Sequence, residues 1–248
     1  MVVAISHRSV KVKPKLIFQN LNPNYTMKIV IELFFSVITI RRLRTFYTYI
    51  KPTTDIYTLK RITMTEKNVI DIINSTSSHK AMGADKISAR MLKIPAPVTA
   101  PSVTKLINYS INNAVFPRTW KTAKVTPLFK KGDSSDVNNY RPISVLPVLS
   151  KIVERHVHSN LYAYLSENKL LFSNQSGFRK YHSTETALLK LVDQLLFNLD
   201  NNRVSGLILV DYSKAFDMVD HNILLSKLRV YGISETSLQW FQSYLSDR

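Results

Sequence analysis

The sequence contains no cysteine, which excludes disulfide bonds, thiolate zinc sites and a cysteine nucleophile. Acidic residues are scarce: 17 Asp and Glu stand against 34 Lys and Arg, a formal net charge of +17. A long apolar run is also lacking. The best one, from Ile29 to Ile40, is about a dozen residues long and includes Glu32, whereas a membrane-spanning helix needs roughly 20. These absences disfavour a disulfide-stabilised or membrane-spanning protein.

The 248 residues are 45% hydrophobic, which predicts one or two domains with a packed core rather than wholesale disorder. The excess of positive charge predicts a polyanionic partner, either nucleic acid or an anionic membrane surface. Residues 1–62 hold eleven Lys and Arg but two acids, a net charge of +9, which leaves +8 for residues 63–248. We therefore predict a basic extension over 1–62 and a folded domain over 63–248.

The basic extension shows no clear period and no repeat. Its stretch 31–50 is rich in β-branched and aromatic residues and carries a basic cluster at Arg41, Arg42 and Arg44. A strand or a buried helix with basic flanks is one interpretation, and a membrane-surface or RNA-binding segment is another. The residues themselves leave this choice open.

From Thr63 onward the apolar residues become periodic. Thr63 and Glu66 have the spacing of a capping box, which predicts a helix start there. Apolar positions at helical spacing predict further helices at 102–115, 149–166, 185–199, 222–230 and 236–245. Residues 123–129 look extended, with Pro127 indicating an edge or a bulge, and the short apolar run 204–210 predicts a buried strand. The predicted fold class is α+β, with helices outnumbering strands.

The predicted strand 204–210 leads directly into a carboxylate, Asp211, and a short loop then carries Phe216, Asp217 and Asp220. A carboxylate at the end of a central strand is well placed to hold a divalent metal, because the strand fixes its direction. The alternative is an aspartate that caps the turn or helix that follows it.

The segment DYSKAFDMVDH (211–221) resembles the first catalytic palm motif of reverse transcriptases from non-LTR (LINE-type, jockey-like) retrotransposons. The resemblance implies that Asp211 binds the catalytic Mg²⁺ ions, with Mn²⁺ as a possible substitute. It implies that Phe216 lies under the sugar of the incoming nucleotide and disfavours a 2′-hydroxyl. Asp217 and Asp220 are then structural and bond nearby backbone. The implied mechanism is two-metal phosphoryl transfer to a primer 3′-hydroxyl.

Two segments upstream resemble further blocks of this family, in the same order. GADKISARMLK (83–93) is similar to a short block before the fingers, and KTAKVTPLFKKGDSSDVNNYRPISVL (121–146) is similar to the fingers block that holds the triphosphate. The matching cations are Lys130 or its neighbour Lys131, and Arg141. Arginine can grip phosphate oxygens in two places, which suits this role. The alternative for the two lysines is a solvated hairpin tip.

A third block, SNQSGFRKYHSTETAL (173–188), resembles the next fingers motif, and ETSLQWFQSYLSDR (235–248) resembles the family's text after the palm motif. The resemblance implies that Gly177 permits close approach of a nucleic-acid strand, while Phe178 and Arg179 contact template bases and phosphate. Ser183 or Thr184 is expected to cap the helix that follows.

The resemblance covers roughly residues 65–248 and implies the fingers and partial palm of a right-hand polymerase. Its substrates would be an RNA template, a DNA primer and a dNTP. In the family, a Gly-rich block, an Asp-Asp turn and a thumb come after the matched motifs, and no two Asp residues are adjacent in this sequence. We therefore expect a fragment of an RNA-directed DNA polymerase that is inactive alone. The alternative is a degenerate remnant that acts at most as a basic nucleic-acid-binding module.

Overall fold

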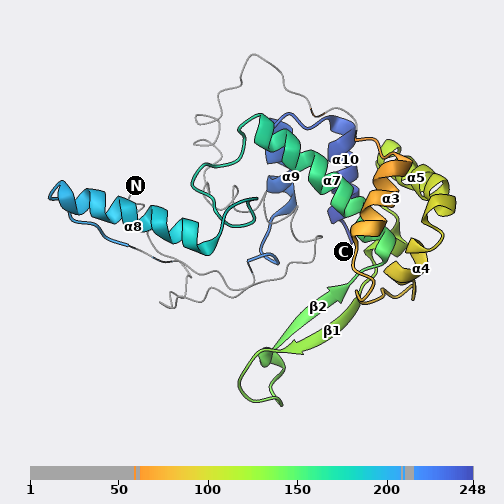
Figure 1. Cartoon of the computed structure of the whole chain (residues 1–248), viewed down its shortest axis with the longest axis horizontal. Helices are drawn as coiled ribbons and strands as arrows, with labels where there is room; N and C mark the ends of the chain where they lie inside the picture. The colour runs from red at the N-terminus through yellow and green to blue at the C-terminus, as the bar shows by residue number, and fades with distance from the viewer. Residues whose placement is uncertain (1–58, 60–61, 208, 210–214, 248) are drawn as a thin grey trace.

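The computed structural model describes residues 59, 62–207, 209 and 215–247 (Figure 1). Within these residues the chain is mostly helical, with one small sheet, so the predicted mixture of helices and fewer strands is confirmed at that level. The helices are α3 (Glu66–Ser75), α4 (Ala89–Lys93), α5 (Ala96–Asn112), α6 (Arg118–Lys121), α7 (Val148–Glu167), α8 (Thr184–Asp200), α9 (His221–Val230) and α10 (Glu235–Leu245). The strands are β1 (Lys124–Phe129) and β2 (Tyr140–Val145).

The predicted helices at 149–166, 185–199, 222–230 and 236–245 agree within one residue at each end with α7, α8, α9 and α10. The helix predicted at 102–115 instead begins at Ala96 and ends at Asn112. Its N-terminal half contains Pro97 and Pro101. Pro97 lies in the first turn, where the N–H groups have no helical partner, whereas Pro101 lies inside the helix and removes one of its hydrogen bonds.

Two helix starts are fixed by capping residues. The cap of α3 is Thr65, whose hydroxyl accepts a bond from Asn68 N, so the predicted Thr63 cap is wrong by two residues. The backbone carbonyl of Thr63 instead forms a hydrogen bond with Nε2 of His156 on α7, at 3.1 Å. Ser183 caps α8 by accepting from Thr186 N, which confirms one of the two caps predicted there.

The core lies where α3, α5, α7, α9 and α10 come together (Figure 1). The Asn108 side chain on α5 makes two bonds to the backbone of Met64, which holds the entrance of α3 against α5. The hydroxyl of Tyr164 on α7 donates to the carbonyl of Tyr231, at 2.7 Å. Leu59 N donates to Gly232 O, and Leu59 and Ile62 are both buried in this same core.

An aromatic cluster joins the last helix to the rest of the core. Phe116 makes edge-to-face contacts with Trp120, Trp240 and Tyr244, with ring centroids 5.0 to 5.7 Å apart. The hydroxyl of Tyr244 donates to Oε1 of the fully buried Glu154. The region after the palm-like motif is thereby anchored to helices that precede it in the sequence.

The strands β1 and β2 form an antiparallel hairpin that projects from the helices (Figure 1). Pro127 faces Pro142 across the pair, and every residue of β1 is exposed. The extended conformation predicted for 123–129 is therefore confirmed, with Pro127 on a strand that is an edge.

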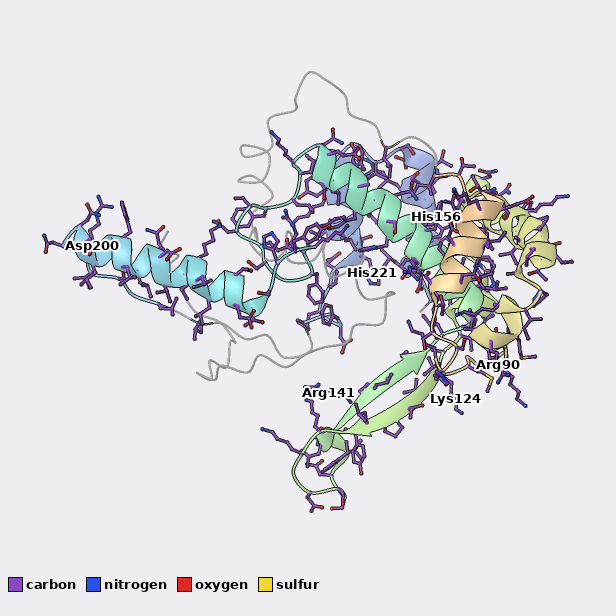
Figure 2. The ribbon with its side chains drawn as sticks, in the orientation of Figure 1. Arg90, Lys124, Arg141, His156, Asp200 and His221 are labelled. Carbon is purple, nitrogen blue, oxygen red and sulfur yellow. The ribbon has the colours of Figure 1, made fainter. Side chains whose placement is uncertain are left out.

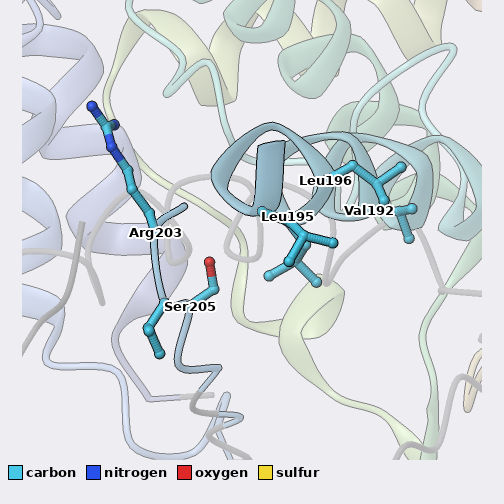
Figure 3. Close-up of a pocket in the computed structure, with 7 residues that line it drawn as sticks. Val192, Leu195, Leu196, Arg203 and Ser205 are labelled. Carbon is cyan, nitrogen blue, oxygen red and sulfur yellow. The ribbon is translucent and has the colours of Figure 1, made fainter. Parts of the chain in front are cut away.

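The helix α8 extends away from the core and has no buried residue (Figure 1). Its apolar side chains are instead exposed: Leu188, Leu189, Val192, Leu196, Phe197 and Leu199. A mostly apolar pocket of about 540 Å³ lies between α8 and the segment 203–205 (Figure 3). None of the helices in the described part of the chain is long and apolar enough to cross a membrane.

The buried strand predicted at 204–210 is wrong for its described residues. Residues 204–207 and 209 belong to no strand and are exposed, and Val204 is fully exposed. A strand needs a partner to bond its backbone, and in the part of the chain that the structure describes the one sheet contains only β1 and β2. The apolar composition of this segment suits a buried strand, but no strand among the described residues pairs with it. Asp211, predicted at its end, lies outside the described residues.

Candidate nucleotide and nucleic-acid interface

The hairpin brings its predicted phosphate-binding cations to one end. Lys130 follows β1 directly, and its backbone N donates to the carbonyl of Asn139 at 2.8 Å. Arg141 lies on β2 opposite Leu128, so strand pairing keeps it close to Lys130 and Lys131 along the hairpin. Figure 2 shows Arg141 towards the tip and Lys124 at the end near the helices. Both Lys130 and Lys131 are exposed, and Arg141 is half-buried.

The loop between the strands is held by its own hydrogen bonds. The Asn139 side chain donates to the carbonyl of Asp133 at 2.9 Å, and the Tyr140 hydroxyl donates to the carbonyl of Ser134 at 2.8 Å. Hydrogen bonds from Ser135 hold the pKa of Asp133 below its ordinary value. Gly132 has φ of +97°, a conformation that glycine adopts readily. The lysines therefore precede a structured turn rather than a loose tip.

The predicted template contacts lie in the segment between α7 and α8. Phe178 has φ of +61° and is half-buried. Nη1 of Arg179 donates to the carbonyl of Phe172 at 3.1 Å, while its buried Nε has no hydrogen-bond partner. A Cβ placed on Gly177 would meet no atom within 4 Å. The surrounding chain therefore does not require glycine there, which leaves the prediction of close strand approach untested.

The predicted metal region is only partly described. Phe216 lies half-buried in the turn before α9. Asp220 caps α9 by accepting bonds from the backbone N of Asn222 and Ile223, so its predicted structural role is confirmed. Asp217 is exposed. Among the residues that the structure describes, no three His, Asp or Glu side chains cluster in a way that could hold a metal ion.

Known proteins are similar to this chain over the region that contains these candidate site residues. The family described as "Reverse transcriptase (RNA-dependent DNA polymerase)" matches residues 129–248, which include the hairpin tip, the segment between α7 and α8, and Phe216. The chain is 32% identical over 190 residues to "Probable RNA-directed DNA polymerase from transposon BS" of Drosophila melanogaster. The chain carries a reverse transcriptase domain of the non-LTR retrotransposon type. The resemblance drawn from the sequence motifs is thereby confirmed.

Other relatives of this reverse transcriptase domain agree. "RNA-directed DNA polymerase from mobile element jockey" of Drosophila melanogaster is 30% identical over 167 residues, which cover 67% of this chain and 18% of the relative. "Probable RNA-directed DNA polymerase from transposon X-element" is 30% identical over 162 residues, covering 65% and 18%. The match to the transposon BS protein covers 73% of this chain and 20% of that protein. The chain thus spans about a fifth of the length of these curated relatives.

Sequence reasoning missed several residues that shape the domain's candidate interface. Asn139 and Tyr140 fix the hairpin loop through their side-chain hydrogen bonds. One sequence signal could have identified them, because both belong to the stretch NNYRP (138–142) that also contains Arg141. Tyr181 was missed as well. Its positive φ of 65° could not be read from the sequence, because tyrosine is not a residue typical of that conformation.

Proposed function

We propose that this chain forms the fingers and the beginning of the palm of an RNA-directed DNA polymerase from a non-LTR retrotransposon. The observation that carries the proposal is the hairpin, which gathers Lys130, Lys131 and Arg141 at one end inside the region that matches the family. A triphosphate needs several positive charges from an element that extends toward it. The substrates proposed for the whole enzyme are an RNA template, a DNA primer and a dNTP.

Each predicted residue has a proposed part in this function. Lys130, Lys131 and Arg141 bind the triphosphate, with the lysines acting as point charges and Arg141 as a two-pronged donor. Gly177, Phe178 and Arg179 contact the template strand. Phe216 sets the preference for deoxyribose by its bulk beside the 2′-carbon of the nucleotide. Support comes from the position of all these residues inside the region that matches the family and from the exposure of the lysines.

The proposal assigns metal binding to Asp211, with Mg²⁺ as the natural ion and Mn²⁺ as a substitute. When bound, such ions stabilise the charge of the transferring phosphoryl group. The described residues do not form a metal site by themselves: Asp220 caps α9, and Asp217 belongs to no cluster of three His, Asp or Glu side chains among those residues. The Asp-Asp turn and the thumb of the family are assigned to polypeptide outside these 248 residues, since relatives are about five times as long as the matched segment.

The division of the chain into a basic extension over 1–62 and a polymerase part over 63–248 is also a proposal. Leu59 and Ile62 are buried in the main core, which supports a domain start close to that boundary. For the first 58 residues we propose nucleic-acid contact through charge alone, because nine of them are Lys or Arg and two are acids.

A second candidate function is a basic module that binds nucleic acid without catalysis. The net charge of +17 favours it, since charge of this size attracts a polyanion whatever the state of the catalytic residues. The two candidates differ in one respect that can be measured. A polymerase hairpin binds nucleoside triphosphates at a defined place, whereas a purely basic surface binds them weakly and without preference among its lysines.

The test is a titration of the 248-residue chain with a fluorescent dATP analogue. The double variant Lys130→Ala/Lys131→Ala and the single variant Arg141→Ala are compared with Lys124→Ala. Lys124 is an exposed lysine at the first position of β1, the end of the hairpin away from its loop. Charge-assisted bonds contribute roughly 1.5–3 kcal/mol each, so we expect at least tenfold weaker binding for the first two variants and little change for the third. Equal losses in all three variants would favour the basic module instead.

A further inference from the structure

The segment between α7 and α8 contains two residues in a conformation that their side chains disfavour. Phe178 has φ of +61° and Tyr181 has φ of +65°. Residues other than glycine, asparagine and aspartate rarely adopt this left-handed region, and bulky side chains in it are outliers. Such outliers persist where the surrounding structure fixes them, and they concentrate at binding sites. The strained residues therefore make this segment a candidate binding site.

Hydrogen bonds on both sides of Tyr181 fix its backbone. Lys180 N donates to the hydroxyl of Tyr162 on α7 at 3.1 Å, and His182 N donates to the carbonyl of Arg179 at 3.3 Å. Ser183 then begins α8 through its capping box with Thr186. The backbone of Tyr181 is thus held between two neighbours that are themselves hydrogen-bonded.

The ring of Tyr181 points out of the fold. Tyr181 is 88% exposed, the most exposed aromatic residue among those that the structure describes as exposed hydrophobics. The ammonium of Lys180 lies 4.9 Å from the centre of its ring. A strained and outward-facing aromatic ring with a cation beside it contributes nothing to the core of this chain. It has the composition of a platform on which a nucleic-acid base can stack while a phosphate meets the cation.

Unsatisfied polar atoms in the same segment are a second and independent observation. Gln175 is 7% exposed, and its Oε1 has no hydrogen-bond partner. The buried Nε of Arg179 is also without one. Buried polar atoms are nearly always paired in folded proteins, and exceptions are typical of functional sites. The donor Nε of Arg179 and the cations Arg179 and Lys180 suit an anionic ligand, and the acceptor Oε1 of Gln175 suits a hydrogen-bond donor on such a ligand.

We propose that Tyr181 stacks on an unpaired base of single-stranded nucleic acid, with Lys180 contacting an adjacent phosphate. This inference rests on the proposed function and adds a residue that the family motif does not assign. Stacking requires only the flat face of a base, so little sequence preference is expected. RNA and DNA single strands share this face, and the test compares them.

The test measures binding of the full 248-residue chain to short oligonucleotides by fluorescence anisotropy. Each oligonucleotide is made as RNA and as DNA, and a DNA version without bases supplies the backbone alone. The variants are Tyr181→Ala and Tyr181→Phe, with Tyr109→Ala as the control because Tyr109 is a 68% exposed tyrosine on α5. We expect Tyr181→Ala to weaken binding to strands with bases by roughly 5- to 150-fold, the usual range for loss of one stacking contact. Tyr181→Phe and Tyr109→Ala should bind as the unmodified chain does.

The strand without bases separates stacking from charge. The unmodified chain and Tyr181→Ala should bind it equally, because there is no base to stack. A further variant, Tyr181→Gly, should unfold at a higher urea concentration than the unmodified chain, since glycine adopts a positive φ without strain. It should nevertheless bind strands with bases as weakly as Tyr181→Ala. Stability and binding then move in opposite directions, which a merely structural role of Tyr181 does not produce.

Two results would overturn the inference while leaving the proposed function intact. One is unchanged affinity of Tyr181→Ala for RNA and DNA that the unmodified chain binds. The other is an equal loss for strands with and without bases, which would make the effect one of backbone contact. If the unmodified chain binds no oligonucleotide at all, the inference and the proposed function fail together. A larger loss on RNA than on DNA would identify the template strand as the ligand and support the inference.

Discussion

The indole N–H of Trp240 donates a hydrogen bond to the hydroxyl of Ser110, 3.1 Å away and 130 positions earlier in the sequence. That hydroxyl in turn donates to the carbonyl of Val115 at 2.6 Å. Trp240 lies on α10 and Ser110 on α5, and both are buried. A helix beyond the segment 211–221 is thus hydrogen-bonded to a helix that precedes the hairpin of β1 and β2.

Removal of this hydrogen bond should destabilise the domain. Ser110→Ala leaves the buried indole N–H without a partner, which costs roughly 1–3 kcal/mol. Trp240→Phe removes the donor together with part of the ring, so the loss combines a hydrogen bond with a cavity. Urea unfolding followed by circular dichroism measures both. The double variant should lose less unfolding free energy than the sum of the two single losses. Strict additivity would show that the two side chains do not interact.

Acid should destabilise the domain through His156. Burial lowers the pKa of His156 from its ordinary value of 6.5, and this effect outweighs the opposing hydrogen bond to the Thr63 carbonyl. Below pH 6.5 the unfolded chain takes up a proton that the folded chain resists, so the free energy of unfolding falls as the pH falls. The fall levels off once the pH is below the lowered pKa.

The variant His156→Gln isolates this contribution. Glutamine retains an N–H donor for the Thr63 carbonyl but does not titrate, so the variant should lose less stability than the unmodified chain between pH 7 and pH 5. Thermal unfolding at a series of pH values provides the comparison. Parallel curves for the two proteins would show that His156 is not responsible.

The sequence predicted those parts of the fold that depend on local patterns. The period of the apolar residues predicted α7 to α10, and Pro127 predicted an exposed edge strand. Both features depend on residues that are close together in the sequence. The run 204–210 failed for the opposite reason. A strand is completed by partners that lie elsewhere in a sequence, and no local pattern shows whether those partners are present.

The candidate site divides in the same way. The sequence motif at 121–146 predicted Lys130, Lys131 and Arg141 as site residues. The pairing of β1 with β2 brings them to one end of the hairpin. The loop bonds of Asn139 and Tyr140 and the positive φ of Tyr181 depend on backbone geometry that the sequence does not encode in any single residue type. Residue types thus indicated the chemistry, and the structure added the residues that position it.

The exposed side of α8 should make the chain self-associate. Leu188, Leu189, Val192 and Leu196 lie on this helix without burial, and contiguous apolar surface of this kind favours association. Leu196→Lys should shift the chain toward monomer in sedimentation velocity at a fixed concentration. Gln194→Lys, which adds the same charge at an exposed polar position of the same helix, is the matched control. An equal shift in both variants would attribute the effect to charge rather than to the apolar surface.

The basic N-terminal segment should supply much of the nonspecific affinity for nucleic acid. Deletion of residues 1–58 removes nine cations and two acids while it keeps the buried Leu59 and Ile62. We expect this deletion to weaken binding to single strands more than replacement of Lys130, Lys131, Arg141 and Arg179 with alanine. The plot of log affinity against log salt should flatten by about 0.7 per lost phosphate contact. Unchanged affinity and salt dependence would show that the segment does not contact nucleic acid.

The most direct test of the central claim is primer extension on an RNA template by a jockey-type polymerase in which residues 63–248 of this chain replace the matching segment. We predict DNA synthesis that depends on the template and on Mg²⁺. Asp211→Asn should abolish synthesis while affinity for nucleic acid stays within about twofold, and Phe216→Ala should admit ribonucleotides more readily. A folded chimera that binds template and primer but synthesises no DNA, or one whose synthesis survives Asp211→Asn, would contradict the account.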